Sequence, residues 1–130
     1  MLLDHFSNGQ DYSPAIVDLL LAKNKWGMTP LHVCVVEYNY DAFSKLILHF
    51  DDILDYNMRD NLEYSALHYA AFDHKFARFL TILAQSPRVD TNAQTKSGLT
   101  PLHIAVINKN YYGAMILVSC PTWTILGKFS

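Results

Sequence analysis

Three stretches of this chain share one arrangement of residues, and that arrangement decides the fold. They read Gly27-Met28-Thr29-Pro30-Leu31-His32-Val33-Cys34-Val35, Glu63-Tyr64-Ser65-Ala66-Leu67-His68-Tyr69-Ala70-Ala71 and Gly98-Leu99-Thr100-Pro101-Leu102-His103-Ile104-Ala105-Val106. Their histidines lie 36 and 35 residues apart, and Asn57 and Asn92 each stand 11 residues before the second and third histidines. Two landmarks that keep one register indicate an internal repeat.

Each stretch is expected to begin a helix. Thr29 and Thr100 are good N-cap residues, and a proline follows each at the first helical position, where its missing N–H costs nothing. A second helix is predicted downstream from apolar residues at helical spacing: Ala42, Phe43, Leu46, Ile47 and Phe50; Phe76, Phe79, Leu80, Ile82 and Leu83; Tyr112, Met115, Ile116 and Leu117. Neither helix of a pair can bury its apolar face alone, so the pairs should stack around one elongated core.

The repeat resembles the ankyrin family, in which Thr-Pro-Leu-His opens the first helix of a unit of about 33 residues. The residues that carry the resemblance are Thr29, Pro30, Leu31, His32, Leu67, His68, Thr100, Pro101, Leu102 and His103. It implies an all-α solenoid of stacked helix-turn-helix units joined by β-hairpin-like loops. It also implies that the three histidines form hydrogen bonds near the hairpins.

The repeat register divides the chain into five parts. We expect a flank with a fragment of a preceding repeat at residues 1–22, repeats at 23–58 and 59–93, a truncated third repeat at 94–120, and an apolar tail at 121–130. Ser13-Pro14 predicts a short helix through Leu21. Isolated arrays usually need terminal repeats with a polar outer face, and neither end here is polar. Three explanations stay open: the chain is a fragment, its tails fold over its ends, or a partner caps it.

Two departures from the family concern the connections between helices. The first two repeats exceed the family spacing by three and two residues, around Asp51-Asp52 and Ser86-Pro87-Arg88, which we expect in loops that mark a binding edge. The glycine that usually ends the first helix is replaced by Tyr38, His74 and Lys109. We therefore expect the neighbouring asparagines, Asn39 and Asn110, to adopt positive φ.

Composition argues against several functional classes. Lys and Arg number 10 and Asp and Glu 12, so no basic groove for nucleic acid is expected. The longest mostly apolar run, residues 111–126, is too short for a membrane span and is interrupted by Pro121. Cys34 and Cys120 do not suggest a disulfide framework, and the N-terminus does not resemble a signal peptide, so we expect a cytoplasmic or nuclear protein.

The sequence also lacks the motifs of catalysis. It contains no phosphate loop, nucleophile elbow, Cys-x-x-Cys pair or His-Glu-x-x-His segment, so we predict no enzyme activity and no cofactor. Equivalent histidines on packed helices about 8–10 Å apart cannot share a zinc that holds each nitrogen at about 2.0–2.1 Å. No metal site is therefore expected.

The resemblance implies a protein-binding face made of hairpin tips and exposed positions of each first helix. Transferred to this chain, the face comprises Trp26, Met28, Arg59, Leu62, Tyr64, Phe72, Asp73, Lys96, Leu99 and Ile107. Trp26, Arg59, Tyr64 and Phe72 are the leading candidates, because Trp, Tyr and Arg dominate binding hot spots. The structural alternative is that Trp26 and Phe72 pack against neighbouring repeats.

Three functional hypotheses follow. The first is a non-catalytic protein-interaction module or adaptor. The second is an I-kappa-B-like regulator of a Rel-homology transcription factor, because residues 53–62 and 92–98 look like segments of that group. The third is the targeting part of a larger enzyme or signalling protein. Self-association through uncapped ends is a further expectation.

Overall fold

The computed structural model of the protein describes residues 13–119, and within that range it is helical without a regular strand. The helices are α2 (Pro14–Leu21), α3 (Pro30–Val36), α4 (Tyr40–Phe50), α5 (Ala66–Ala70), the short 3-10 helix η1 (His74–Phe76), α6 (Ala77–Gln85), α7 (Pro101–Ile107) and α8 (Tyr111–Val118).

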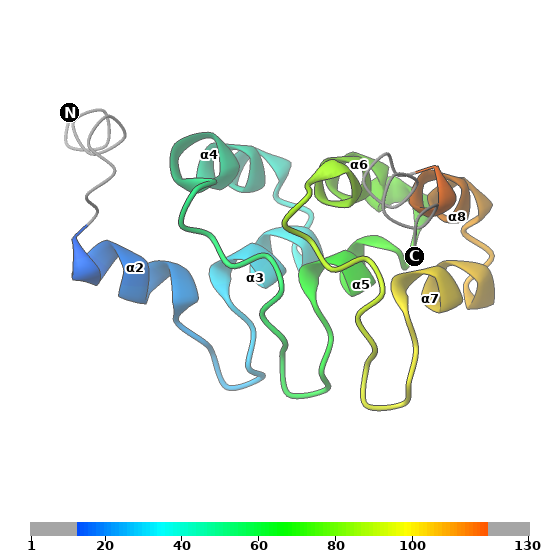
Figure 1. The fold of residues 1–130 in the computed structure, drawn as a ribbon, viewed down its shortest axis with the longest axis horizontal. Coiled ribbons are helices and arrows are strands. Elements are labelled where there is room, and N and C mark those ends of the chain that lie inside the picture. The colour runs from blue at the N-terminus through cyan, green and yellow to red at the C-terminus, as the bar shows by residue number, and fades with distance from the viewer. Residues whose placement is uncertain (1–12, 120–130) are drawn as a thin grey trace.

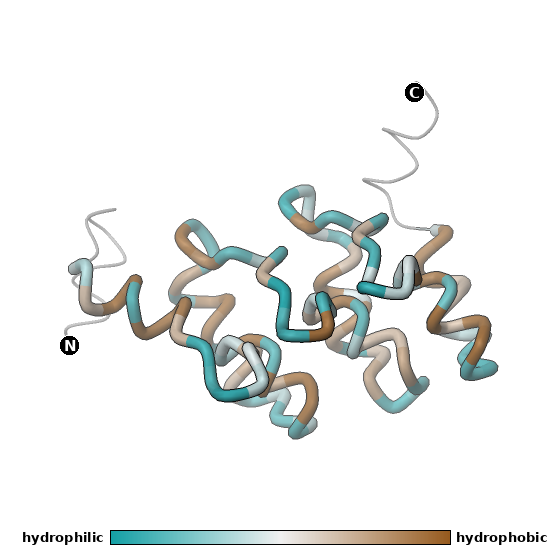
Figure 2. The backbone as a smooth tube through the Cα atoms, turned by 90° about the horizontal axis from the view of Figure 1, so that it is seen from below, coloured by the Kyte–Doolittle hydropathy of each residue, from teal (hydrophilic) through white to brown (hydrophobic). Residues whose placement is uncertain are grey.

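The helices form two rows, as the ankyrin resemblance implied. Helices α3, α5 and α7 make one row, α4, α6 and α8 make the other, and the loops before α3, α5 and α7 project away from the second row (Figure 1). Each loop closes like a β-hairpin, because the N–H groups of Asn24, Asp60 and Thr95 donate to carbonyls four residues later, at 2.9–3.0 Å. Hydrophobic positions concentrate in the helices and hydrophilic ones in the loops (Figure 2).

The core lies between the two rows. Phe43, Phe79, Leu67, Leu80 and Leu83 are its largest fully buried apolar side chains. Phe43 and Phe79 link α4 to α6 through an edge-to-face contact with ring centroids 4.8 Å apart. Small buried residues in the first row, among them Ala66, Ala70 and Ala105, allow the short helices α5 and α7 to approach closely. The apolar pattern therefore produces one continuous core shared between repeats.

The repeated histidine ties each helix start to the next hairpin. In the first two repeats the backbone N–H of Thr29 or Ser65 donates to the histidine Nδ1 at 3.1 or 3.0 Å. Because Nδ1 accepts, Nε2 carries the proton and donates onward: His32 to the carbonyl of Tyr64 at 2.9 Å, and His68 to that of Leu99 at 3.1 Å. His103 repeats the local bond with the N–H of Thr100 at 3.0 Å. The implied hydrogen bonding near the hairpins is therefore present at all three histidines.

Acidification from pH 7.5 to 5.0 is expected to destabilise the stack. Burial lowers the pKa of His32 and His68 below 6.5, and the bonds to Tyr64, Leu99 and Ala93 only partly oppose it. As the pH falls, the unfolded chain therefore takes up protons before the folded protein does. The stability that the two neutral, buried histidines contribute is complete above pH 6.5 and is lost as the pH falls through 6.5 towards their folded-state pKa. Urea midpoints at the two pH values measure the effect. An equal midpoint in the parent protein at both pH values would contradict the expectation.

The turns between paired helices differ from the expectation. Tyr38 and Lys109 adopt positive φ, at 57° and 60°, whereas Asn39 and Asn110 do not. The chain forms Schellman motifs, in which Asn39 N–H donates to the Cys34 carbonyl at 2.8 Å and the residue before it must be left-handed. The asparagine side chains instead cap the second helices, so the prediction for Asn39 and Asn110 was wrong. His74 needs no positive φ, because Asp73 caps η1 there.

The extra residues between repeats hold the loops together. The Arg88 guanidinium donates to the Leu54 carbonyl at 2.7 Å and also to the carbonyl of Asp51. Asn57 connects the same two loops, donating to the Arg88 carbonyl at 2.9 Å and accepting from Asp90 N–H at 2.7 Å. The insertions therefore have a structural role, and the binding edge suggested for them stays a prediction.

At the N-terminal end, the predicted helix after Ser13 is present as α2, which packs against α3. Ser13 caps it by accepting from the Ile16 N–H at 3.3 Å. Residues 1–12 of the expected flank, the last residue of the truncated third repeat and the tail at 121–130 lie outside the described residues. The repeat boundaries stay a prediction.

Candidate protein-binding face

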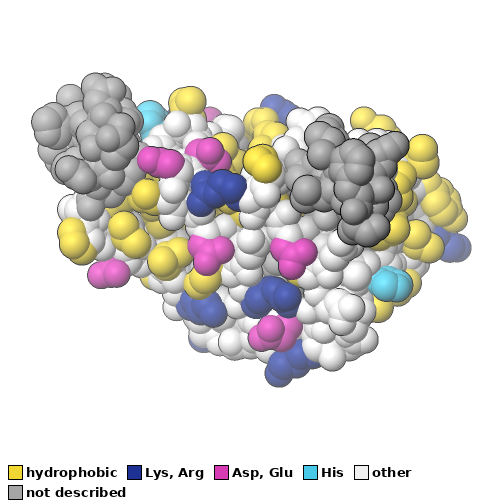
Figure 3. All heavy atoms as spheres, in the orientation of Figure 1, with side chains coloured by type: hydrophobic (Ala, Val, Ile, Leu, Met, Phe, Trp, Pro, Cys, Tyr) yellow, Lys and Arg dark blue, Asp and Glu magenta, His cyan; other side chains and the backbone are white. Residues whose placement is uncertain are grey.

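The predicted binding residues divide into two groups by exposure. Trp26, Leu62, Asp73, Lys96 and Ile107 are exposed, and Met28, Arg59, Tyr64, Phe72 and Leu99 are partly buried. All ten lie on hairpin tips or near the ends of first-row helices, since the repeats keep one register. Charged side chains are spread over the hairpin region in the view of Figure 3.

A pocket lies where the first hairpin meets α3. Its volume is about 350 Å³, and its lining comprises Asn24, Trp26, Met28, Val33, Val36 and Glu37. Trp26 is 58% exposed, so most of its ring is free for a partner, and Lys25 Nζ lies 4.7 Å from the ring centroid. An open apolar pocket beside a cation and a carboxylate is suited to an apolar side chain of a polypeptide with polar neighbours.

Asn24 and Val33 also line this pocket, although they were not among the predicted binding residues. Asn24 shapes the tip, because its Oδ1 accepts from the N–H groups of Trp26 and Met28 at 2.9 and 3.0 Å. Val33 lies one helical turn before Val36, and this three-residue spacing was a signal that the two share a helix face.

Arg59 connects two hairpins. Its Nη1 donates to the Glu63 carbonyl within its own hairpin at 2.9 Å and to the Gln94 carbonyl of the next at 2.6 Å. It also lies 3.7 Å from the Glu63 carboxylate, and 29% of its side chain is exposed. Its role as a binding hot spot stays a prediction, and its structural role is established by these contacts.

Tyr64 and Phe72 pack against each other. Their rings stack with centroids 6.0 Å apart, and both also contact Tyr69. Phe72 is partly buried against the core, and its ring partners lie within its own repeat, whereas Trp26 is exposed. Packing of Trp26 and Phe72 against neighbouring repeats therefore stays a prediction.

Other chemistry is limited within residues 13–119. No group of three or more His, Cys, Asp or Glu side chains there is arranged to hold a metal ion. Cys34 is a buried free thiol, and burial raises its pKa, which disfavours the nucleophilic thiolate. None of the helices described combines the length and apolar character needed to cross a membrane.

The hairpins, the capping histidines and the two rows of helices are the features that the ankyrin resemblance implied. A sequence model of ankyrin repeats, in three copies, matches residues 5–89. The chain belongs to the ankyrin repeat family. A search of curated proteins finds no match. Ankyrin repeats generally act as protein–protein interaction modules and typically lack catalytic activity. An I-kappa-B-like role for this chain stays a prediction.

Proposed function

We propose that this ankyrin stack is a non-catalytic adaptor that binds a partner polypeptide along the hairpin tips and the exposed ends of α3, α5 and α7. The observation that carries the proposal is the pocket of about 350 Å³ around Trp26. A large aromatic side chain that stays mostly exposed beside a pocket is typical of a binding hot spot. The buried Cys34 thiol is compatible with a cytoplasmic or nuclear location.

The anchoring pocket suggests how affinity is distributed. Val36, Phe72 and Ile107 occupy equivalent positions at the ends of the first-row helices, and Val36 and Ile107 are 39% and 62% exposed. A partner that follows the stack would therefore meet an apolar position on each repeat, with its deepest contact at repeat one. Lys25 and Lys96 provide charged positions on the tips beside this row.

Trp26→Ala is expected to weaken partner binding by about tenfold or more, because hot-spot truncations cost about 2 kcal/mol or more and 1.4 kcal/mol is tenfold. The partner is first identified by affinity purification and mass spectrometry, and its affinity is then measured by titration calorimetry with the purified partner. Trp26 is a sharper choice than Tyr64 or Phe72, whose truncation would also remove packing.

Tyr112→Ala is the matched control, because Tyr112 is a 62% exposed aromatic residue on the other row of helices. It should leave the affinity unchanged. Unchanged binding by Trp26→Ala, or weakening by Tyr112→Ala alone, would refute the proposed face. Circular dichroism spectra of both variants check that the fold is intact.

A further inference from the structure

The C-terminal end of the stack exposes residues whose equivalents are buried in earlier repeats. Leu31 and Leu67 are 3% and 1% exposed, but Leu102 at the same position is 38% exposed. One turn later, Val35 is fully buried and Val106 is 54% exposed. Since the residue types are unchanged, the difference arises because repeat three has no following repeat within residues 13–119.

Within the described residues, the hydrogen bonds that join one repeat to the next are also missing at this end. His32 and His68 each donate from Nε2 to the next hairpin, whereas His103 Nε2 has no such partner among the described residues. The carbonyls of Trp26 and Leu62 accept from the following hairpin, at 3.0 and 3.3 Å, and Ser97 at the equivalent position accepts no such bond in that range. The C-terminal end face, defined as Leu102, His103, Val106, Ile107 and Val118, is therefore an unfilled half of the interface that joins earlier repeats.

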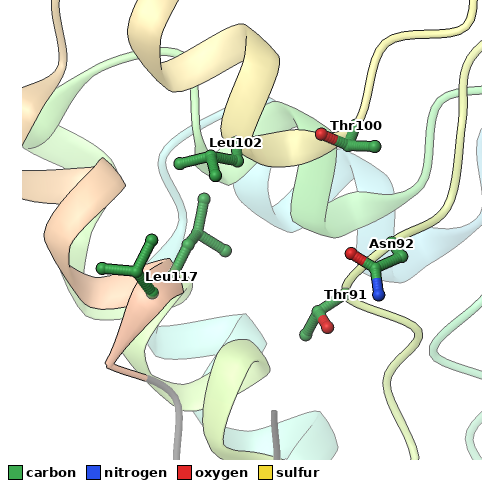
Figure 4. Close-up of a pocket in the computed structure, with 6 residues that line it drawn as sticks. Thr91, Asn92, Thr100, Leu102 and Leu117 are labelled. Atoms are coloured by element: carbon green, nitrogen blue, oxygen red, sulfur yellow. The ribbon is translucent and has the colours of Figure 1, made fainter. Parts of the chain in front are cut away.

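This face is apolar and hollowed. One pocket of about 280 Å³ is lined by Thr100, Leu102, His103, Val106 and Ile107. A second, of about 120 Å³, lies between α7, the end of α8 and the loop at Thr91-Asn92, with Leu102 and Leu117 on one side (Figure 4). Hydrophobic side chains gather at this end of the molecule (Figure 3).

The sequence after Ser119 supplies side chains of the type that this face lacks. Residues 120–130 lie outside the described part of the chain, and among them Trp123, Ile125, Leu126 and Phe129 are large and apolar while Lys128 is the only charge. The earlier repeats place Asn57 and Asn92 seven residues after α4 and α6, but the seventh residue after α8 is Ile125. The sequence of the segment therefore departs from the pattern of the second and third hairpins.

Reach and tethering favour this segment over other occupants. Eleven extended residues span roughly 36 Å, against about 8–10 Å between packed helices, and the segment leaves α8 beside Val118 on the face itself. A short flexible tether gives an effective concentration on the order of millimolar, which a second copy at micromolar concentration cannot match.

We propose that residues 121–130 pack over the C-terminal end face and cap the ankyrin stack, with Trp123, Ile125 and Leu126 as the apolar contacts. Ile107 is shared between the C-terminal end face and the proposed binding face. The inference is nevertheless tested separately, because the proposed function rests on Trp26 at the first hairpin, at the other end of the stack. Of the three explanations for the apolar ends of the chain, it corresponds to the one in which a tail folds over an end of the stack.

The test uses the intrinsic fluorescence of Trp123. The chain has two tryptophans, and Trp26→Phe at an exposed position leaves Trp123 as the sole reporter. In this variant we expect emission at shorter wavelength, and acrylamide quenching severalfold weaker, than in the urea-unfolded chain. Both values should be independent of protein concentration, with a monomeric mass by light scattering.

Variants of the face and of the segment locate the contact. In the Trp26→Phe background, Leu102→Glu with Val106→Glu should restore strong quenching, while the matched exposed pair Leu48→Glu with Leu62→Glu should not. Ile125→Ser with Leu126→Ser leaves the described core intact and should have the same effect as the face variant.

Three outcomes would overturn the cap. The first is Trp123 quenched as strongly in the folded as in the unfolded chain. The second is protection that appears only with rising concentration and a doubled mass, which would assign the face to a second copy. The third is protection that persists in both the face and segment variants, which would place Trp123 elsewhere. None of these outcomes bears on Trp26 and partner binding.

Discussion

Replacing His68 with alanine is expected to lower the free energy of unfolding by about 3 kcal/mol, because a buried polar group left without its partner costs about 1–3 kcal/mol and His68 serves more than one. Its ring is fully buried, accepts from Ser65 N–H at 3.0 Å, and donates to the Ala93 and Leu99 carbonyls at 2.9 and 3.1 Å. The substitution removes a bridge between repeats two and three. Urea unfolding followed by circular dichroism measures the loss.

His103→Ala is the control for this prediction. His103 makes the same local bond with its N-cap residue, but it is exposed and reaches no further hairpin within residues 13–119. Its loss should cost about 1 kcal/mol or less, the usual range for a helix cap. If both alanine variants lose equal stability, the local cap and not the bridge between repeats is the source of the effect.

Phe79→Ala is expected to be the most destabilising single substitution, with a loss of about 3–5 kcal/mol for a buried phenylalanine. Phe79 is 1% exposed, and its ring centroid lies 4.8 Å from that of Phe43, 5.4 Å from Tyr40 and 6.1 Å from Tyr38. The cavity would open where α4 meets α6, so repeats one and two would lose their shared packing. Thermal unfolding should show a fall of roughly 12 °C or more.

The exposed Tyr112 provides the comparison, because Tyr112→Ala removes an aromatic ring of similar size from the surface of α8. Such a surface change should stay within about 0.5 kcal/mol. A similar fall in melting temperature for both variants would mean that the aromatic cluster around Phe79 does not hold the repeats together.

Local signals predicted the helices and their starts. Helices begin after the predicted N-cap residues Thr29 and Thr100, whose capping contacts reach no more than three positions along the chain. Ser65 takes the same role at the start of α5. The same holds for Ser13 and α2. Interactions within one turn of chain depend little on the rest of the protein, so sequence alone is enough to assign them.

The helix-to-helix turns show where local reasoning was insufficient. Positive φ was expected at asparagine, but Tyr38 adopts it, with its ring against Phe76 and Phe79 at centroid distances of 6.0 and 6.1 Å. The Schellman hydrogen bonds require the left-handed residue at Tyr38 and equally at Lys109, where the Asn110 N–H donates to the Ala105 carbonyl at 2.8 Å. Asn39 instead caps α4, a role that its residue type also favours.

The sequence predicted which residues belong to the candidate face. What each of these residues contacts became clear only from the structure. Trp26 and Met28 line one pocket, as their shared place on the first tip suggested, but Asn24 and Val33 complete it. Arg59 was chosen for its residue type, yet its guanidinium binds carbonyls of two hairpins. Which exposed positions are available to a partner depends on how neighbouring repeats use them.

The same four residues, Thr-Pro-Leu-His, open α3 and α7, and by themselves they determined that a capped helix begins at each place. They did not determine burial: Leu31 is 3% exposed and Leu102 is 38% exposed. Helix capping is satisfied within one turn of the chain, whereas burial requires atoms from the next repeat. The tertiary structure alone decided that the first motif lies in the core and the last faces outward at the end of the stack.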